Sequence, residues 1–104
     1  MATAEIEAGI CGLTTTVRTK ADGAVVRVDI ESDCEHIANL AAALTEVEPF
    51  REISFRGQEP LTLEKAREHC AHAACPVPTG ILKAIEVEAG LALPKDVTIR
   101  VSRE

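Results

Sequence analysis

The chain contains no tryptophan and no tyrosine, and only Phe50 and Phe55 are aromatic. Apolar residues nevertheless make up 46% of the sequence, near the globular average, so an aliphatic core of Ala, Val, Ile and Leu can form. Few aromatic side chains are present to stack against bases, the formal net charge is −6, and no stretch concentrates Lys and Arg. We therefore expect no nucleic-acid partner.

The sequence also lacks an apolar run of about 18 residues, the length that a membrane-spanning helix needs. Its first residues, Met-Ala-Thr-Ala-Glu-Ile-Glu, have neither the basic start nor the apolar stretch of a secretory signal peptide. These absences predict a cytoplasmic protein with no membrane partner. Because cytosolic thiols are kept reduced, the four cysteines indicate metal or redox chemistry rather than structural disulfides.

The length of the chain predicts a single domain spanning residues 1–104. The clearest strand pattern lies at residues 24–31, where apolar and polar side chains alternate directly after an Asp22-Gly23 turn signal. Weaker alternation or a high content of β-branched residues marks three further segments. The predicted strands cover residues 4–10, 13–19, 24–31 and 97–101.

Three later segments carry apolar residues at the helical period. Ser32-Asp33 is expected to cap the first helix and Thr62 the second, while Gly90 is expected to follow the third. Residues 50–60 fit either a short strand or a loop. The predicted helices cover residues 33–47, 62–73 and 79–90.

Strands that come first and helices that follow predict an α+β fold. We expect a three- to four-stranded, mainly antiparallel sheet that is covered on one face by three helices. The strands of that sheet are expected to hold Ile6, Val17, Val26, Val28 and Ile99.

The four cysteines lie near the ends of predicted elements, where side chains from different elements can converge. Cys11 lies in a Gly-flanked bend, Cys34 in the first turn of a helix and Cys75 just before the third helix. Cys70 is predicted to lie inside the second helix, near its end. Helix N-termini favour thiolates, and thiolates bind soft metals, so we expect these four cysteines to form a zinc or iron–sulfur site. No C-x2-C pair is present, and the alternative is that the cysteines pack as small hydrophobes.

Three histidines accompany the cysteines. His69 and His72 lie three residues apart beside Cys70, and His36 follows Cys34 by two residues. Each histidine is either a further metal ligand or proton donor near the site, or an exposed residue on a helix surface.

The order of these cysteine neighbourhoods resembles the U-type iron–sulfur cluster scaffolds, the NifU/IscU family, over residues 5–90. Those scaffolds carry a Cys-Gly pair before a hairpin, a cysteine that opens the first long helix, and a His-Cys pair at a later helix start. Cys11 and Cys34 match the first two cysteines, and either Cys70 or Cys75 matches the third. The resemblance implies a NifU/IscU-like fold, a bound iron–sulfur cluster, and partners such as a cysteine desulfurase or cluster-acceptor proteins.

The sequence departs from the scaffold family at three points. Leu13 and Thr14 stand where the scaffolds have an aspartate shortly after the first cysteine. The chain has four cysteines instead of three. The strand predicted at residues 97–101 is extra.

The run Cys75-Pro76-Val77-Pro78 carries a second, local resemblance, to sulfur-carrier proteins of the TusA type. Those carriers hold their reactive cysteine in a Cys-Pro-x-Pro motif before a helix, and the two prolines keep the backbone extended there. The likeness implies that Cys75 carries a persulfide. The two prolines and the following helix N-terminus also predict that Cys75 is the most reactive thiol, followed by Cys34 and then by Cys70 inside its helix. The whole chain also resembles a small prokaryotic family with this set of cysteines, which implies no function.

Three classes of protein are thus open. A cluster scaffold or metal carrier predicts cysteines gathered at an accessible edge, a sulfur-transfer protein predicts that Cys75 alone is exposed, and a structural or interaction domain predicts dispersed, packed cysteines. An independent enzyme is the least favoured class, because no Ser/His/Asp set and no phosphate-binding loop is recognisable. We predict a small cysteine-rich protein that binds a metal ion or an iron–sulfur cluster as a scaffold or carrier.

Overall fold

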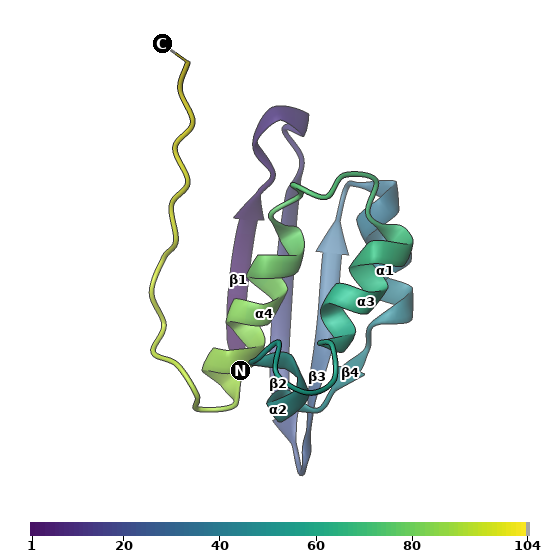
Figure 1. The fold of residues 1–104 in the computed structure, drawn as a ribbon, viewed down its shortest axis with the longest axis vertical. Helices are drawn as coiled ribbons and strands as arrows, with labels where there is room; N and C mark the ends of the chain where they lie inside the picture. Colours follow the sequence, from purple (N-terminus) through teal and green to yellow (C-terminus); the bar gives the residue numbers. More distant parts are fainter. Residues whose placement is uncertain (104) are drawn as a thin grey trace.

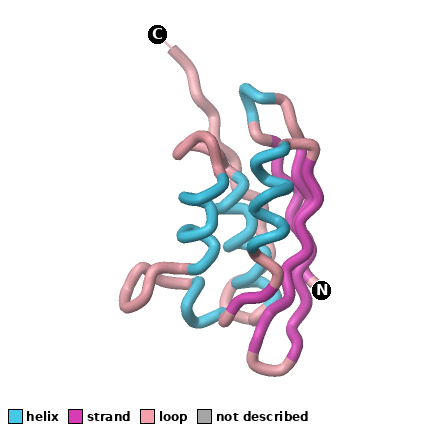
Figure 2. Tube along the Cα trace, turned by 90° about the vertical axis from the view of Figure 1, so that its right-hand side faces the viewer, coloured by secondary structure: helices cyan, strands magenta, loops and turns pink. Residues whose placement is uncertain are grey.

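The computed structural model describes residues 1–103 and has two layers, a sheet and a layer of helices. Figure 2 shows that the helices lie against one face of the sheet and leave the other face open. The sheet is antiparallel throughout, with its strands in chain order. Its strands are β1 (Ala2–Glu7), β2 (Thr14–Asp22), β3 (Val25–Ser32) and β4 (Glu46–Val47). The α+β class and the one-sided cover by helices are therefore confirmed.

The helical layer is built from segments that follow the first three strands (Figure 1). The last and longest helix lies over β1 and β2. The first helix lies over β3 and beside the third helix. A short 3-10 turn, η1 (Gly9–Cys11), connects β1 to β2. The helices are α1 (Glu35–Ala43), α2 (Pro49–Glu52), α3 (Leu61–His69) and α4 (Val77–Glu88).

The alternation in the strands decides which face of the sheet is buried. Val17 on β2 and Val26 on β3 are almost completely buried, whereas Arg27 and Asp29 between the buried positions of β3 are exposed. Because successive side chains point to opposite faces, one face packs on the helices and the other is solvated. The core is aliphatic, and both aromatic side chains of the chain, Phe50 and Phe55, are exposed.

The strand predicted at residues 97–101 is wrong. These residues form no strand in the described chain, and Val97, Ile99 and Val101 are exposed. The fourth strand of the sheet is instead β4, where Val47 pairs with Val26. Alternation shows only that a segment suits a strand, and within the described residues this segment pairs with no edge of the sheet.

Several predicted boundaries also need correction. The first strand ends at Glu7 rather than at residue 10, because the chain turns into η1 and leaves Ile10 fully exposed. The first helix ends at Ala43 rather than at residue 47, because the following residues pair with β3. Residues 50–60 form no strand, since Pro49 begins the short helix α2, as proline often does at a first helical position.

Candidate functional site at the thiol end

The segments that carry the four cysteines meet at one end of the molecule. Strands β1 and β3 both run towards this end, α1 begins there, and α3 ends where α4 begins (Figure 1). The topology therefore gathers η1, the β3–α1 junction and the connection at residues 70–76 around the same end. We call this region the thiol end, and its cysteines are Cys11, Cys34, Cys70 and Cys75.

Cys34 is fixed by the junction between a strand and a helix. It is the N-cap residue of α1, with an extended backbone, and its carbonyl oxygen accepts a hydrogen bond from the Ala38 amide at 2.8 Å. Its own amide donates to Ser32 Oγ at 3.1 Å. The Ser32-Asp33 cap expected from the sequence thus lies just before the helix, and Ser32 instead orients the backbone of Cys34. The half-buried Cys34 side chain packs against the core.

Cys70 and Cys75 bound the connection between α3 and α4. Cys70 is the C-cap residue of α3 and not an interior helical residue as predicted, although its amide still donates to the Ala66 carbonyl at 2.8 Å. Cys75 closes a turn by donating its amide to the His72 carbonyl at 3.3 Å. Both side chains are half-buried and pack against the core. The connection thus turns back on itself and brings the two thiols to neighbouring positions.

The ionisation of Cys70 reports how close three of the thiols lie. Burial, first of all, together with the charge of Cys75, a side-chain hydrogen bond with Cys75 and the charge of Cys34, raises the pKa of Cys70 to about 11. A neighbouring thiolate disfavours a second negative charge in a poorly solvated place. Cys34 and Cys75 therefore both lie within interaction range of Cys70, and Cys70 is a neutral thiol at physiological pH.

Cys11 differs from the other three cysteines. It lies at the end of η1, is exposed, and is not among the groups that act on Cys70. Gly12 follows it with φ of 68°, a left-handed conformation that glycine adopts without steric cost and that lets the chain turn into β2. Cys11 thus reaches the thiol end from a loop and not from the core.

The histidines lie around the thiol end but not among its thiols. His36 is exposed in the first turn of α1, and His72 is exposed in the connection between α3 and α4. His69 is the last residue of α3, with Nε2 3.9 Å from a carboxylate oxygen of Glu68. Across residues 1–103, no three Cys, His, Asp or Glu side chains are already arranged to hold a metal ion. A coordination site would therefore require side chains at the thiol end to move together.

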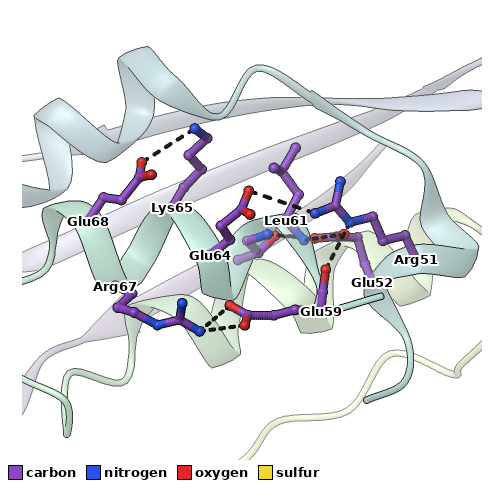
Figure 3. A network of polar contacts seen from close by, with 9 residues as sticks. Arg51, Glu52, Glu59, Leu61, Glu64, Lys65, Arg67 and Glu68 are labelled. Carbon is purple, nitrogen blue, oxygen red and sulfur yellow. Dashed lines mark hydrogen bonds and ion pairs between the residues drawn. The ribbon is translucent and has the colours of Figure 1, made fainter. Parts of the chain in front are cut away.

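A buried carboxylate that the sequence analysis missed holds the opposite end of α3. Glu52 is 4% exposed, and its two oxygens accept hydrogen bonds from the Leu61 amide at 2.8 Å, the Thr62 amide at 2.8 Å and the Thr62 hydroxyl at 2.6 Å (Figure 3). Thr62 is thus not the N-cap residue expected from the sequence. It instead donates hydrogen bonds to Glu52, whose carboxylate caps the helix. Helix α3 begins after Pro60, and no Ser, Thr, Asp or Asn stands at its start to accept hydrogen bonds from its first amides. This missing local cap was the one signal in the sequence that an acceptor from elsewhere in the chain is needed.

Ion pairs extend this network along the exposed side of α3 (Figure 3). Arg51 approaches Glu64 at 3.8 Å, and Arg67 pairs with Glu59. Surface pairs of this kind contribute little each, so the buried Glu52 carboxylate provides the main polar attachment of α3. That attachment sets the direction in which α3 delivers Cys70 to the thiol end.

The fold and the site define a class: a small α+β protein in which a one-sided antiparallel sheet gathers four cysteine-bearing segments at one end. None of the helices within residues 1–103 combines the length and the apolar character needed to cross a membrane. The chain belongs to the Family of unknown function (DUF6951), whose match covers residues 2–101. No curated protein and no solved structure matches the chain.

Proposed function

We propose that the thiol end binds a soft metal ion or an iron–sulfur cluster through Cys34, Cys70 and Cys75, with Cys11 as the fourth ligand. The observation that carries the proposal is that Cys34 and Cys75 both act on Cys70, although the three half-buried thiols come from three different element ends. Cysteines that serve only as small hydrophobes need no such convergence. The protein would act as a scaffold or carrier in the cytoplasm, with a cysteine desulfurase or cluster-acceptor proteins as partners.

The chemistry of the donor set fits such a ligand. Thiolates are the preferred ligands of zinc and of iron–sulfur clusters, and a half-buried position keeps competing water away. Because Cys70 is protonated at neutral pH, binding must release its proton, and affinity must rise as the pH rises towards about 11. Proton release on binding is thus a measurable signature of thiolate coordination, although it does not by itself single out Cys70.

The connection at residues 70–76 supplies the adjustment that binding requires. Its two cysteines flank a turn, and residues 71–74 are exposed, so rotation of these thiols towards Cys34 disturbs little of the core. Cys11 lies in an equally exposed turn. Binding would therefore convert nearby thiols into a coordination site by local movement within the two turns.

The test is anaerobic reconstitution of the reduced protein with Zn²⁺, or with ferrous iron and sulfide, followed by metal analysis and visible absorbance. We expect one stoichiometric site, and loss of that site in Cys34→Ser, Cys70→Ser and Cys75→Ser. A matched serine variant, Cys11→Ser, should weaken binding less, because Cys11 approaches from an exposed loop. A chain that stays metal-free under all of these conditions contradicts the proposal.

The sulfur-carrier alternative has a separate signature. It predicts that Cys75 alone is exposed, but Cys75 is half-buried, as Cys34 and Cys70 are. The exposure pattern therefore favours shared binding over a single carrier thiol. A persulfide found by mass spectrometry on Cys75 alone, in a protein that binds no metal, would reverse this preference.

A further inference from the structure

The segment that follows α4 has strand character without a strand partner. In residues 97–101, Val97, Ile99 and Val101 alternate with Thr98 and Arg100, and the three apolar side chains are 57%, 73% and 90% exposed. Figure 1 shows the segment standing apart from β1 and α4. Covering the apolar face of such a segment removes its side chains from water and is therefore favourable.

The sheet offers one long free edge that matches this segment. Strand β1 lies at the edge of the sheet and pairs only with β2, so its outer amide and carbonyl groups face no other strand within residues 1–103. The opposite edge is β4, which has only two residues and offers little for pairing. A six-residue edge such as β1 is a template for pairing with another extended segment unless something covers it.

The charges on β1 and on residues 97–101 also favour their pairing. Glu5 and Glu7 are exposed on the open face of β1, whereas the polar side of the segment carries the exposed Arg100. Two copies of a chain with a net charge of −6 repel each other on average. Arg100 placed beside the acidic side chains of β1 would offset that repulsion locally, because opposite charges on neighbouring strands stabilise pairing.

We propose that residues 97–101 of each chain pair with the outer edge of β1 in a second copy, which gives a reciprocal, two-fold symmetric dimer with exchanged strands. Each copy has one unpaired strand segment and one long free edge, so a closed pair satisfies both. In this arrangement the apolar side chains continue the helix-covered face beside α4, and Arg100 lies on the acidic open face. The inference does not rest on the function proposed for the thiol end.

The test measures the mass of the reduced chain in solution by light scattering over a dilution series. We expect a dimer that dissociates on dilution, with alternate backbone amides of residues 97–101 protected from hydrogen exchange only while the dimer persists. Ile99→Lys should weaken the dimer by on the order of ten-fold or more, because it places a charge in the covered face. Thr98→Lys adds the same charge one residue earlier, on the acidic face, and should leave the dimer intact.

The controls separate this dimer from other outcomes. Ile99 is already exposed in the single copy, so the substitution leaves the core unchanged and a thermal unfolding curve should confirm it. A wild-type chain that stays monomeric up to about 1 mM overturns the proposal. A dimer that survives Ile99→Lys also overturns the proposal. A monomer in which residues 97–101 are protected from hydrogen exchange does so too, because the segment then pairs with β1 of its own chain.

Discussion

Among single residues, Cys70 is set apart from the other thiols by its surroundings. Burial and the charges of Cys75 and Cys34 raise its pKa to about 11, and only the thiolate attacks an alkylating reagent. The sequence also predicts that Cys70 is alkylated most slowly of these three thiols, but for a different reason. It places Cys70 inside a helix. The structure replaces that reason with desolvation at the end of α3 and with the neighbouring thiols.

We predict that Cys70 is labelled more slowly than Cys34 and Cys75 by limiting iodoacetamide in the reduced, metal-free protein. Its rate should rise steadily as the pH approaches about 11, because the thiolate fraction grows in that direction. Peptide mass spectrometry at a series of pH values reads the three sites in one experiment. Equal labelling of all three at neutral pH would show that Cys70 is neither buried nor near the other two.

Gly80 is a second residue with a specific role, since it lets α4 approach β1. A Cβ atom at this position would lie 2.4 Å from both Cδ1 and Cγ1 of Ile6, which is too close unless Ile6 moves. Alanine improves helix propensity by about 1 kcal/mol, whereas overpacking costs roughly 1–3 kcal/mol. The two effects oppose each other, and the second is the larger.

A double-mutant cycle separates these effects. We predict that Gly80→Ala lowers the free energy of unfolding by about 1 kcal/mol in the wild-type chain and raises it in an Ile6→Ala background, where the overlapping atoms are gone. Denaturant unfolding of the four proteins gives the coupling energy. If the two substitutions are simply additive, α4 does not approach β1 as closely as described.

At the scale of elements, α3 depends on a carboxylate that another helix supplies. Hydrogen bonds to a charged group make a net contribution of about 1.5–3 kcal/mol each, and Glu52 accepts three of them. The favourable position of a negative charge at a helix N-terminus adds to this. A local cap would only begin α3, whereas a cap supplied by α2 also fixes the position of α3 against its neighbouring helices.

We predict that Glu52→Gln lowers the free energy of unfolding by about 2 kcal/mol, because the amide retains one acceptor oxygen and loses the charge. Glu48→Gln is the matched control, since the exposed Glu48 side chain lies one turn earlier and makes no such bonds. Chemical denaturation measures both. A loss of similar size in the two variants would mean that overall charge, rather than the cap, is responsible.

The far end of α4 shows a boundary that the sequence predicts well. Gly90, with φ of 76°, follows the helix, and the amides of Gly90 and Leu91 donate to the carbonyls of Val87 and Glu86 at 3.1 and 2.9 Å. This pattern is the Schellman motif, in which a left-handed residue closes a helix. The same turn directs residues 91–103 away from the helical layer, which sets up their proposed pairing with a second copy.

For the whole molecule, the raised pKa of Cys70 links stability to alkaline pH. The unfolded chain has the ordinary cysteine pKa of 9.0, whereas the folded chain has a value of about 11. Because the folded pKa is the higher one, the unfolded state loses its proton first as the pH rises. The contribution is fully present below about pH 9 and is lost as the pH rises through about 11.

We predict that the melting temperature of the reduced, metal-free protein falls between about pH 9 and pH 11, and that Cys70→Ala flattens this part of the profile. Cys11→Ala is the control, because Cys11 is exposed and should leave the slope unchanged. Calorimetry or circular dichroism under reducing conditions gives both profiles. An unchanged slope in Cys70→Ala would assign the alkaline transition to other groups.

The sequence by itself determined which segments bury a face and roughly where helices and strands lie. The alternation at residues 24–31, the Asp22-Gly23 turn and the apolar stripe of α4 are local patterns, and local patterns decide local structure. The α+β class followed from their order. The predictions failed at residues 97–101 and at Glu52, where the outcome depends on a partner distant in the chain.

Only the tertiary structure decided which cysteines act on one another. The spacing of Cys34, Cys70 and Cys75 says nothing about their separation in space, which is set by the direction of β3 and by the antiparallel course of α3 and α4. The same holds for the free edge of β1 and the exposed segment after α4. Sequence patterns report what each segment can bury, whereas proximity and unpaired surfaces arise only when all the segments compete for the same core.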